Sequence, residues 1–262
     1  MRRWPALWLI FILALGGCRA LPPPAPPPTP VTSVGEILGH LAARQERLKA
    51  FQAKGRLTVI SPQRNYSGSS ILKAQAPGGL RVDVLDVLGR SILSFSSDGD
   101  QIQVLSHQEA KFFRGKATPE NVAVFLPARV TVPQVVRLLT ASLPLSSGPP
   151  QEWHYEPTDG AYLLTWGEAG GASRERLWVE PRGFRPVKVE WYEQGRRRFS
   201  VEFSEFGEGD TGTVPRKIVL RGDDPQAELR VAYRDLQLNP SLTSADLVVN
   251  RPPGAAEVLL RP

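Results

Sequence analysis

The chain has few side chains capable of distinctive chemistry, and the first of them is its only cysteine, Cys18. Two glycines (16–17) stand directly before it, after an apolar run (6–15) that follows a basic pair (2–3). A charged head followed by an apolar run too short to span a bilayer permanently is typical of a secretion signal. A single cysteine forms no disulfide within one chain. The pattern therefore predicts an exported protein, with Cys18 at the end of its signal.

Small residues immediately before a cysteine resemble the lipobox of bacterial lipoproteins; the alternative is an ordinary signal that happens to contain a cysteine. The resemblance implies that residues 1–17 are removed as a signal peptide and that Cys18 is acylated on its thiol and on the new amino terminus. Acyl chains contribute about 0.8 kcal/mol per buried methylene, so several would anchor the protein firmly. Residues 18–32, rich in proline, are expected to form an extended tether.

The other chemistry-bearing residues do not cluster along the sequence. No G-x-S-x-G elbow, His-Glu-x-x-His pair or P-loop occurs in the chain. Aspartates at 98, 100, 223 and 224 fall in expected turns, where they are favoured as caps of backbone N–H groups. The three histidines are scattered, at His40, His107 and His154. We therefore expect no enzyme, no cofactor and no metal site.

The charge is modest for a 262-residue chain, with a formal value of +6. Its densest basic run, 196–198, is interpreted first as a solvated hairpin rim and second as a contact for anionic lipid headgroups. A nucleic-acid partner is not expected for an exported protein.

The part of the chain after the tether opens with a helical pattern and then changes period. Ser33 and Glu36 stand at capping-box spacing, and apolar residues at intervals of three, four and seven predict a helix ending near Gly55. From 54 to 114 the apolar period is two, with turns too short for crossover helices, which predicts an antiparallel meander. The expected strands are 56–60, 66–74, 80–86, 91–96, 101–106 and 111–114.

The same order, helix and then strands, follows in the second half. Residues 118–145 return to helical spacing, and a helix at 132–142 is apolar on most of its surface, so it must cover something apolar. The clearest later strands form a long amphipathic hairpin, 187–203, with one apolar and aromatic face. Strands at 216–221 and 228–234 continue the pattern.

Roughly ten to twelve strands with only two or three helices indicate a mainly β fold. Two architectures satisfy this proportion: a sandwich, or one strongly curved, incompletely closed antiparallel sheet whose concave face is covered by the helices. A sandwich needs no ligand. A curved sheet implies an apolar cavity, because a few helices seldom fill its concave face completely.

The segment 80–93, with a Leu-Gly pair in the loop between two strands, resembles the corresponding segment of the LolA/LolB lipoprotein-localisation superfamily. Segments 51–60 and 132–139 also resemble LolB, and 235–240 with 252–254 resemble the ending of LolA. The resemblance implies the curved half-barrel for residues 33–240, followed by a C-terminal tail at 241–262. The chain departs from the LolB pattern at Val87, where proline is usual.

Family resemblance also implies the function and its residues. An exposed leucine in the LolB loop assists membrane insertion, and it corresponds here to Leu88, flanked by Val87 and Gly89. The cavity of the family takes the acyl chains of lipoproteins in transit. The residues expected to line it here, unless they simply form core, are Tyr162, Leu164, Trp166, Val187, Val189, Trp191, Phe199, Val201, Phe203, Val135, Leu138 and Leu139.

We therefore expect a LolB-like acceptor, monomeric, that receives acylated lipoproteins from a LolA-type periplasmic carrier and releases them into the outer membrane. Arg19 after the cysteine, in place of aspartate, indicates the outer membrane by the enterobacterial sorting rule, so a lipid-anchored protein on its periplasmic face is expected. The alternatives are a non-catalytic envelope scaffold whose concave face is filled by its own side chains, and a carrier of another lipid on the same fold.

Overall fold

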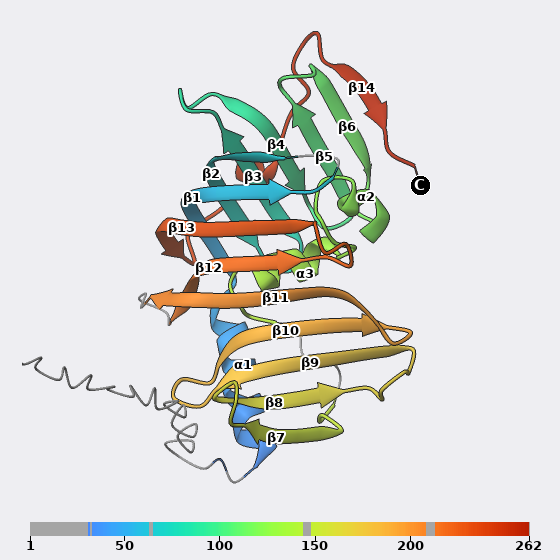
Figure 1. The fold of residues 1–262 in the computed structure, drawn as a ribbon. Helices are drawn as coiled ribbons and strands as arrows, with labels where there is room; N and C mark the ends of the chain where they lie inside the picture. The colour runs from blue at the N-terminus through green and yellow to red at the C-terminus, as the bar shows by residue number, and fades with distance from the viewer. Residues whose placement is uncertain (1–30, 32, 63–64, 144–147, 208–212, 262) are drawn as a thin grey trace, which may run out of the picture.

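The computed structural model describes residues 31, 33–62, 65–143, 148–207 and 213–261. All its strands belong to one 14-stranded sheet with the order β14-β6-β5-β4-β3-β2-β1-β13-β12-β11-β10-β9-β8-β7 (Figure 1). Adjacent strands are antiparallel except β14 and β6. The two outermost strands, β14 and β7, do not pair with each other, so the curved sheet is open. This confirms the predicted mainly β fold with few helices.

The first half of the chain supplies six neighbouring strands of the sheet and the three α-helices of the described residues. Its elements are α1 (Val34–Arg47), β1 (Ala50–Ile60), β2 (Tyr66–Gln75), β3 (Gly79–Leu85), β4 (Ser91–Ser97), β5 (Gln101–Ser106), β6 (Lys111–Lys116), α2 (Pro119–Ala123) and α3 (Val132–Leu138).

The second half supplies the other side of the sheet and, in β14, the edge strand beside β6. Its elements are β7 (Glu152–Glu156), β8 (Ala161–Trp166), β9 (Ser173–Glu180), β10 (Arg185–Glu193), β11 (Arg196–Gly207), β12 (Val214–Arg221), β13 (Glu228–Leu238), the 3-10 helix η1 (Ser244–Leu247) and β14 (Ala256–Leu259). The long β1–β13 ladder joins the two halves, so the first and last long strands meet in the middle of the sheet.

The first helix is shorter than its apolar spacing predicts. It ends at Arg47, and Phe51 lies in β1, where burial alternates with a period of two. A spacing of three between Leu48 and Phe51 suits a helix, but both side chains are buried without one. The capping box predicted at the helix start is also wrong, because the Ser33 side chain makes no cap hydrogen bond. The predicted helix 132–142 likewise ends early, at Leu138.

One large apolar cluster forms the core on the concave face of the sheet. It includes Ile37 and Leu41 of α1, Val122 of α2 and Val136 of α3, together with inward residues of strands from both halves. Figure 1 shows α1 across the β8–β11 side and α3 across the β12–β13 region, on the same side of the sheet. The helices thus cover the concave face, as expected for the curved-sheet alternative and not for a sandwich.

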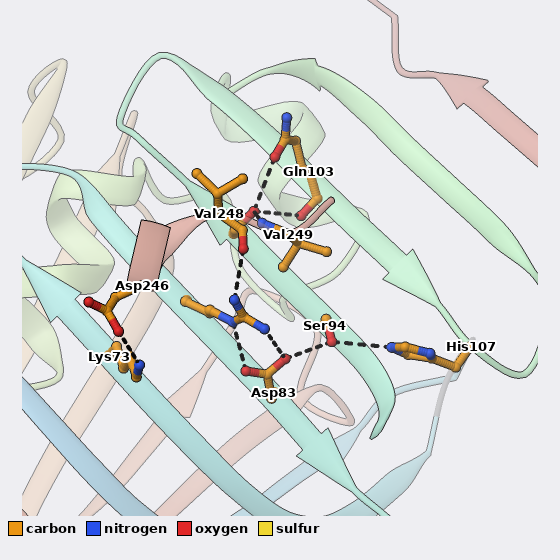
Figure 2. Close-up of polar contacts among 10 residues, drawn as sticks. Lys73, Asp83, Ser94, Gln103, His107, Asp246, Val248 and Val249 are labelled. Atoms are coloured by element: carbon orange, nitrogen blue, oxygen red, sulfur yellow. Dashed lines mark hydrogen bonds and ion pairs between the residues drawn. The ribbon is translucent and has the colours of Figure 1, made fainter. Parts of the chain in front are cut away.

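Residues 241–261, here named the C-terminal strap, pack against the sheet. Lys73 of β2 forms an ion pair of 2.7 Å with Asp246 of η1 (Figure 2). Arg81 of β3 donates to the Val248 carbonyl over 2.7 Å, and the Val249 N–H donates to Ser96 of β4 over 3.2 Å. The segment expected to follow the domain as a tail therefore contributes an edge strand, β14, to it.

Candidate functional site

An apolar cavity of about 50 Å³ lies between the sheet and the two short helices. Its walls are side chains of β1, β2, β3, β4 and β13, and its roof comes from Phe125, Leu126, Val135 and Leu139. No charged side chain lines it. The volume is that of one or two water molecules at about 30 Å³ each, so the space suits an apolar group but is far smaller than an acyl chain.

The structure places the predicted cavity residues in two groups. Val135 and Leu139 line the cavity. The others do not, although all but two are buried in the same core cluster on the concave face: Tyr162, Leu164, Trp166, Val189, Phe199, Val201, Phe203 and Leu138. Trp191 is half-buried against that cluster, with its ring stacked 6.4 Å from that of Phe199. On this side of the sheet the aromatic side chains and α1 occupy the concave face.

Val187 lies apart from the other predicted cavity residues, in a small cluster with Ala161, Leu163 and Trp178 on the opposite face of the sheet. The cause is an irregularity in β10: the β9–β10 register shifts between Pro186 and Lys188. An extra residue of this kind reverses the alternation locally. The predicted placement of Val187 beside Val189 and Trp191 on one face is therefore wrong.

Sequence reasoning missed most of the cavity wall. The wall residues are Leu57, Tyr66, Leu72, Leu80, Val82, Val84, Leu93, Phe95, Leu229 and Val231. They lie at alternate positions of strands that the period of two does predict. Their mostly aliphatic composition gave no reason to prefer them over the more aromatic strands of the second half.

The hairpin joining β3 and β4 carries an exposed apolar tip. Val87 is fully exposed and Leu88 is 73% exposed, which places both side chains outside the core. Gly89 has φ of +79°, a left-handed conformation that glycine adopts without strain. On the same hairpin, Val84 and Leu93 line the cavity. The exposed tip and the cavity wall are thus two parts of one hairpin.

Asp86 organises this tip. Its Oδ1 accepts the backbone N–H groups of Leu88 and Arg90 over 2.8 and 2.9 Å, and its Oδ2 accepts Arg90 Nε over 2.8 Å. The hydrogen bond from the Arg90 backbone is the main cause that lowers the pKa of Asp86. The hydrogen bonds of Asp86 therefore stabilise the turn at the tip, on which Leu88 is exposed.

The C-terminal end of α3 is held by two buried side chains. Arg44 of α1 donates to the carbonyls of Ala141 and Thr140 over 2.9 and 3.0 Å, and Tyr233 of β13 donates to the Leu139 carbonyl over 3.0 Å. Burial lowers the pKa of Arg44 to about 10, which leaves it charged at neutral pH. Burial raises the pKa of Tyr233, so its hydroxyl remains a donor.

The segment around α2 is held at two points. The buried Asn121 side chain donates to the Lys116 carbonyl over 2.9 Å and to the Arg261 carbonyl of the C-terminal strap over 2.8 Å. Beyond α2, the chain passes so close to the β12–β13 turn that a Cβ on Gly222 would lie 1.9 Å from the Pro127 oxygen. We name residues 119–142, which contain α2 and α3, the lid.

The histidines remain apart in the structure. His40 stacks on Phe184, His154 lies 3.7 Å from Glu156, and His107 Nε2 lies 3.3 Å from the Ser94 hydroxyl (Figure 2). Ser94 is buried and donates its only hydroxyl proton to Asp83 over 2.6 Å, so this hydroxyl does not donate to His107. Among the described residues no group of three or more His, Cys, Asp or Glu could hold a metal ion.

Two predictions concern parts of the chain beyond this description. Cys18 and all of the tether except Val31 lie outside the described residues. No helix within the described ranges is long and apolar enough to cross a bilayer.

Comparison with known proteins gives structural neighbours only. No protein-family model matches the chain. No curated protein matches it either. A crystal structure of a domain assigned to outer membrane lipoprotein sorting, from Vibrio parahaemolyticus, has a TM-score of 0.54 at 14% identity, over 81% of this chain and 94% of that one.

Two further solved structures are similar over a comparable extent. A LolA superfamily protein from Nitrosomonas europaea has a TM-score of 0.52 at 15% identity, covering 81% of this chain and 97% of that one. A DUF1329 family protein from Desulfovibrio piger has a TM-score of 0.56 at 12% identity, covering 82% and 97%. These likenesses show that the chain has the LolA-type fold.

Proposed function

We propose that this protein is a LolB-like acceptor, which binds the acyl chains of lipoproteins beneath its lid and passes them into the outer membrane. In this proposal Cys18 carries the lipid anchor, and residues 18–32 hold the folded part near the membrane on its periplasmic face. The donor is a LolA-type carrier, and the protein acts as a monomer. The fold shared with a LolA superfamily protein and a lipoprotein-sorting domain supports this assignment.

The observation that carries the proposal is the β3–β4 hairpin. Exposed apolar side chains at Val87 and Leu88 lose contact with water on entering a bilayer, which stabilises the bound state by about 1.5–3 kcal/mol for each fully buried side chain. The same hairpin lines the cavity through Val84 and Leu93. An acyl chain leaving the cavity along this hairpin would therefore reach the membrane at the tip. No covalent step is needed, because the chain moves between apolar surroundings.

One observation favours a second candidate, an envelope scaffold on the same fold. The cavity of about 50 Å³ is largely filled by the protein's own side chains. A scaffold would keep it closed, whereas an acceptor must displace the lid to admit an acyl chain.

A transfer assay separates the two candidates. The full chain is mixed with a LolA-type carrier holding a lipoprotein with radiolabelled acyl chains, and the two proteins are then separated by affinity tag. An acceptor removes the label from the carrier and releases it to added liposomes. If the label stays with every donor tested, including detergent-free fatty acid complexes, the acceptor proposal is wrong and the scaffold remains.

A further inference from the structure

A buried polar residue, Ser70, stands between two aliphatic residues that line the cavity, Leu72 and Val84. Ser70 of β2 points to the concave face, between Gly68 and Leu72 in the alternation of buried residues along this strand. It is 2% exposed, and its hydroxyl oxygen has no hydrogen-bond partner in the part of the chain that the structure describes. Its cross-strand partner Val84 and its neighbour Leu72 both line the cavity.

An orphan hydroxyl in such a place is unfavourable for the empty protein. A buried donor that loses its hydrogen bond to water without gaining another destabilises the folded state, and alanine at the same place would avoid this cost. Packing gives no reason for the hydroxyl either, since the neighbours of Ser70 on β2 and β3, Leu72 and Val84, are aliphatic. An unsatisfied buried hydroxyl beside a cavity points to a ligand that supplies the missing acceptor.

The pairing of the strands places Ser70 relative to the cavity. In the β2–β3 ladder it pairs with Val84, and the next pair toward the hairpin tip is Ser69 with Leu85. Leu80, at the other end of β3, lies farther from the tip. The residue opposite Ser70 on β1 is Gly55, so no side chain from that position covers the hydroxyl. Leu57 and Tyr66, which lie farther toward the tip, line the cavity as Leu72 and Leu80 do, so Ser70 stands between the two ends of the cavity.

We propose that Ser70 donates a hydrogen bond to the carbonyl oxygen of an ester- or amide-linked acyl chain bound beneath the lid. The carbonyl is the acceptor that distinguishes an acyl chain from plain hydrocarbon. With the carbonyl at Ser70, the hydrocarbon tail lies along the cavity wall, beside residues such as Leu72 and Leu80. This inference rests on the proposed acyl-binding function, and it adds the polar contact by which the cavity selects acyl groups.

A competition experiment on the full chain tests the contact. Methyl dodecanoate and dodecane, which share a hydrocarbon chain and differ in the carbonyl, displace a fluorescent fatty acid from the wild type, Ser70→Ala and Ser69→Ala. Ser69 is the matched control, because it is the adjacent serine but is exposed on the other face of β2. We expect Ser70→Ala to weaken binding of the ester about 2- to 10-fold, as for the loss of one neutral hydrogen bond, and to leave dodecane and the control unchanged.

The outcomes distinguish this inference from the function on which it rests. If the wild type binds neither compound nor the fluorescent probe, acyl binding itself is refuted. If the wild type binds both compounds but Ser70→Ala changes neither affinity, or weakens both equally, acyl binding stands and the carbonyl contact is overturned. The empty Ser70→Ala protein should unfold at the same temperature as the wild type or higher; a lower temperature would mean that the hydroxyl has a structural partner, which also overturns the inference.

Discussion

At the scale of single residues, Leu88 offers a way to separate membrane delivery from folding. Its side chain is 73% exposed, so Leu88→Glu should leave the urea midpoint unchanged while removing an apolar contact with the bilayer. Losing about 1.5–3 kcal/mol of burial predicts roughly 10- to 100-fold weaker association with liposomes. Leu259→Glu is the control, since Leu259 is 75% exposed on the edge strand β14, in another part of the molecule. Equal losses in both variants would contradict a specific role for the tip.

Asp86 predicts how the tip responds to pH. Hydrogen bonds from Arg90 and Leu88 lower the pKa of Asp86 in the folded protein. A depressed carboxyl pKa stabilises the turn above the unfolded value of about 3.9, and this stabilisation is lost as the pH falls through the folded value. Hydrogen exchange of the Leu88 amide should therefore show protection that does not change between about pH 5 and 8 beyond the intrinsic exchange rate. Asp86→Ala should abolish that protection at every pH, whereas loss of protection near neutral pH in the wild type would refute this account.

Single residues also show where sequence reasoning stops. That Leu88 lies in a loop follows from the strands on either side, but its exposure depends on the turn that Asp86 builds. Alternation gives the wrong face for Val187, because the register shift beside it breaks the period of two. The orphan hydroxyl of Ser70 becomes visible only when its neighbours across the sheet are known.

At the scale of elements, a substitution at Gly222 tests the contact between the lid and the β12–β13 turn, and a substitution at Gly39 in α1 provides the comparison. Gly222→Ala would place a Cβ 1.9 Å from the Pro127 oxygen, so the connection between α2 and α3 must shift. We expect a loss of about 1–3 kcal/mol in the free energy of unfolding, as for an overpacked site. Gly39→Ala, within α1 and with nothing near its Cβ, should instead stabilise by about 0.5–1 kcal/mol. Urea denaturation measures the free energy of unfolding of both variants. If Gly222→Ala leaves it unchanged, this contact does not position the lid.

Most strands could be predicted as elements because their burial has a period of two, and β5 coincides with its predicted range 101–106. The two edge strands, β7 and β14, could not be predicted from the sequence. In β14 only Ala256–Leu259 pair, with a strand more than 140 residues away in sequence, so no local pattern reveals the partner. The location of the cavity was also beyond the sequence, since it depends on which half of the sheet each helix covers. Apolar content alone favoured the aromatic second half, which α1 and its own rings occupy.

At the scale of the whole molecule, the size of the cavity makes a kinetic prediction. With about 50 Å³ available, an acyl chain enters only after the lid moves, so opening must precede binding. In stopped-flow mixing with a fluorescent fatty acid, the observed rate should reach a plateau at high ligand concentration, equal to the opening rate. A rate that rises linearly without limit would mean that the closed form binds directly.

We expect the hydrogen bond of Tyr233 to the lid to set the rate at this plateau. Its hydroxyl holds the Leu139 carbonyl at the end of α3 over 3.0 Å, and Leu139 itself lines the cavity. Tyr233→Phe keeps the ring but removes a hydrogen bond of about 0.5–1.5 kcal/mol, so it should raise the plateau about 2- to 10-fold. Gly39→Ala serves as the control for stability alone, because it changes unfolding without touching the lid. If Tyr233→Phe lowers stability yet leaves the plateau unchanged, the end of α3 does not move during opening, and the acyl chain must enter beneath α2.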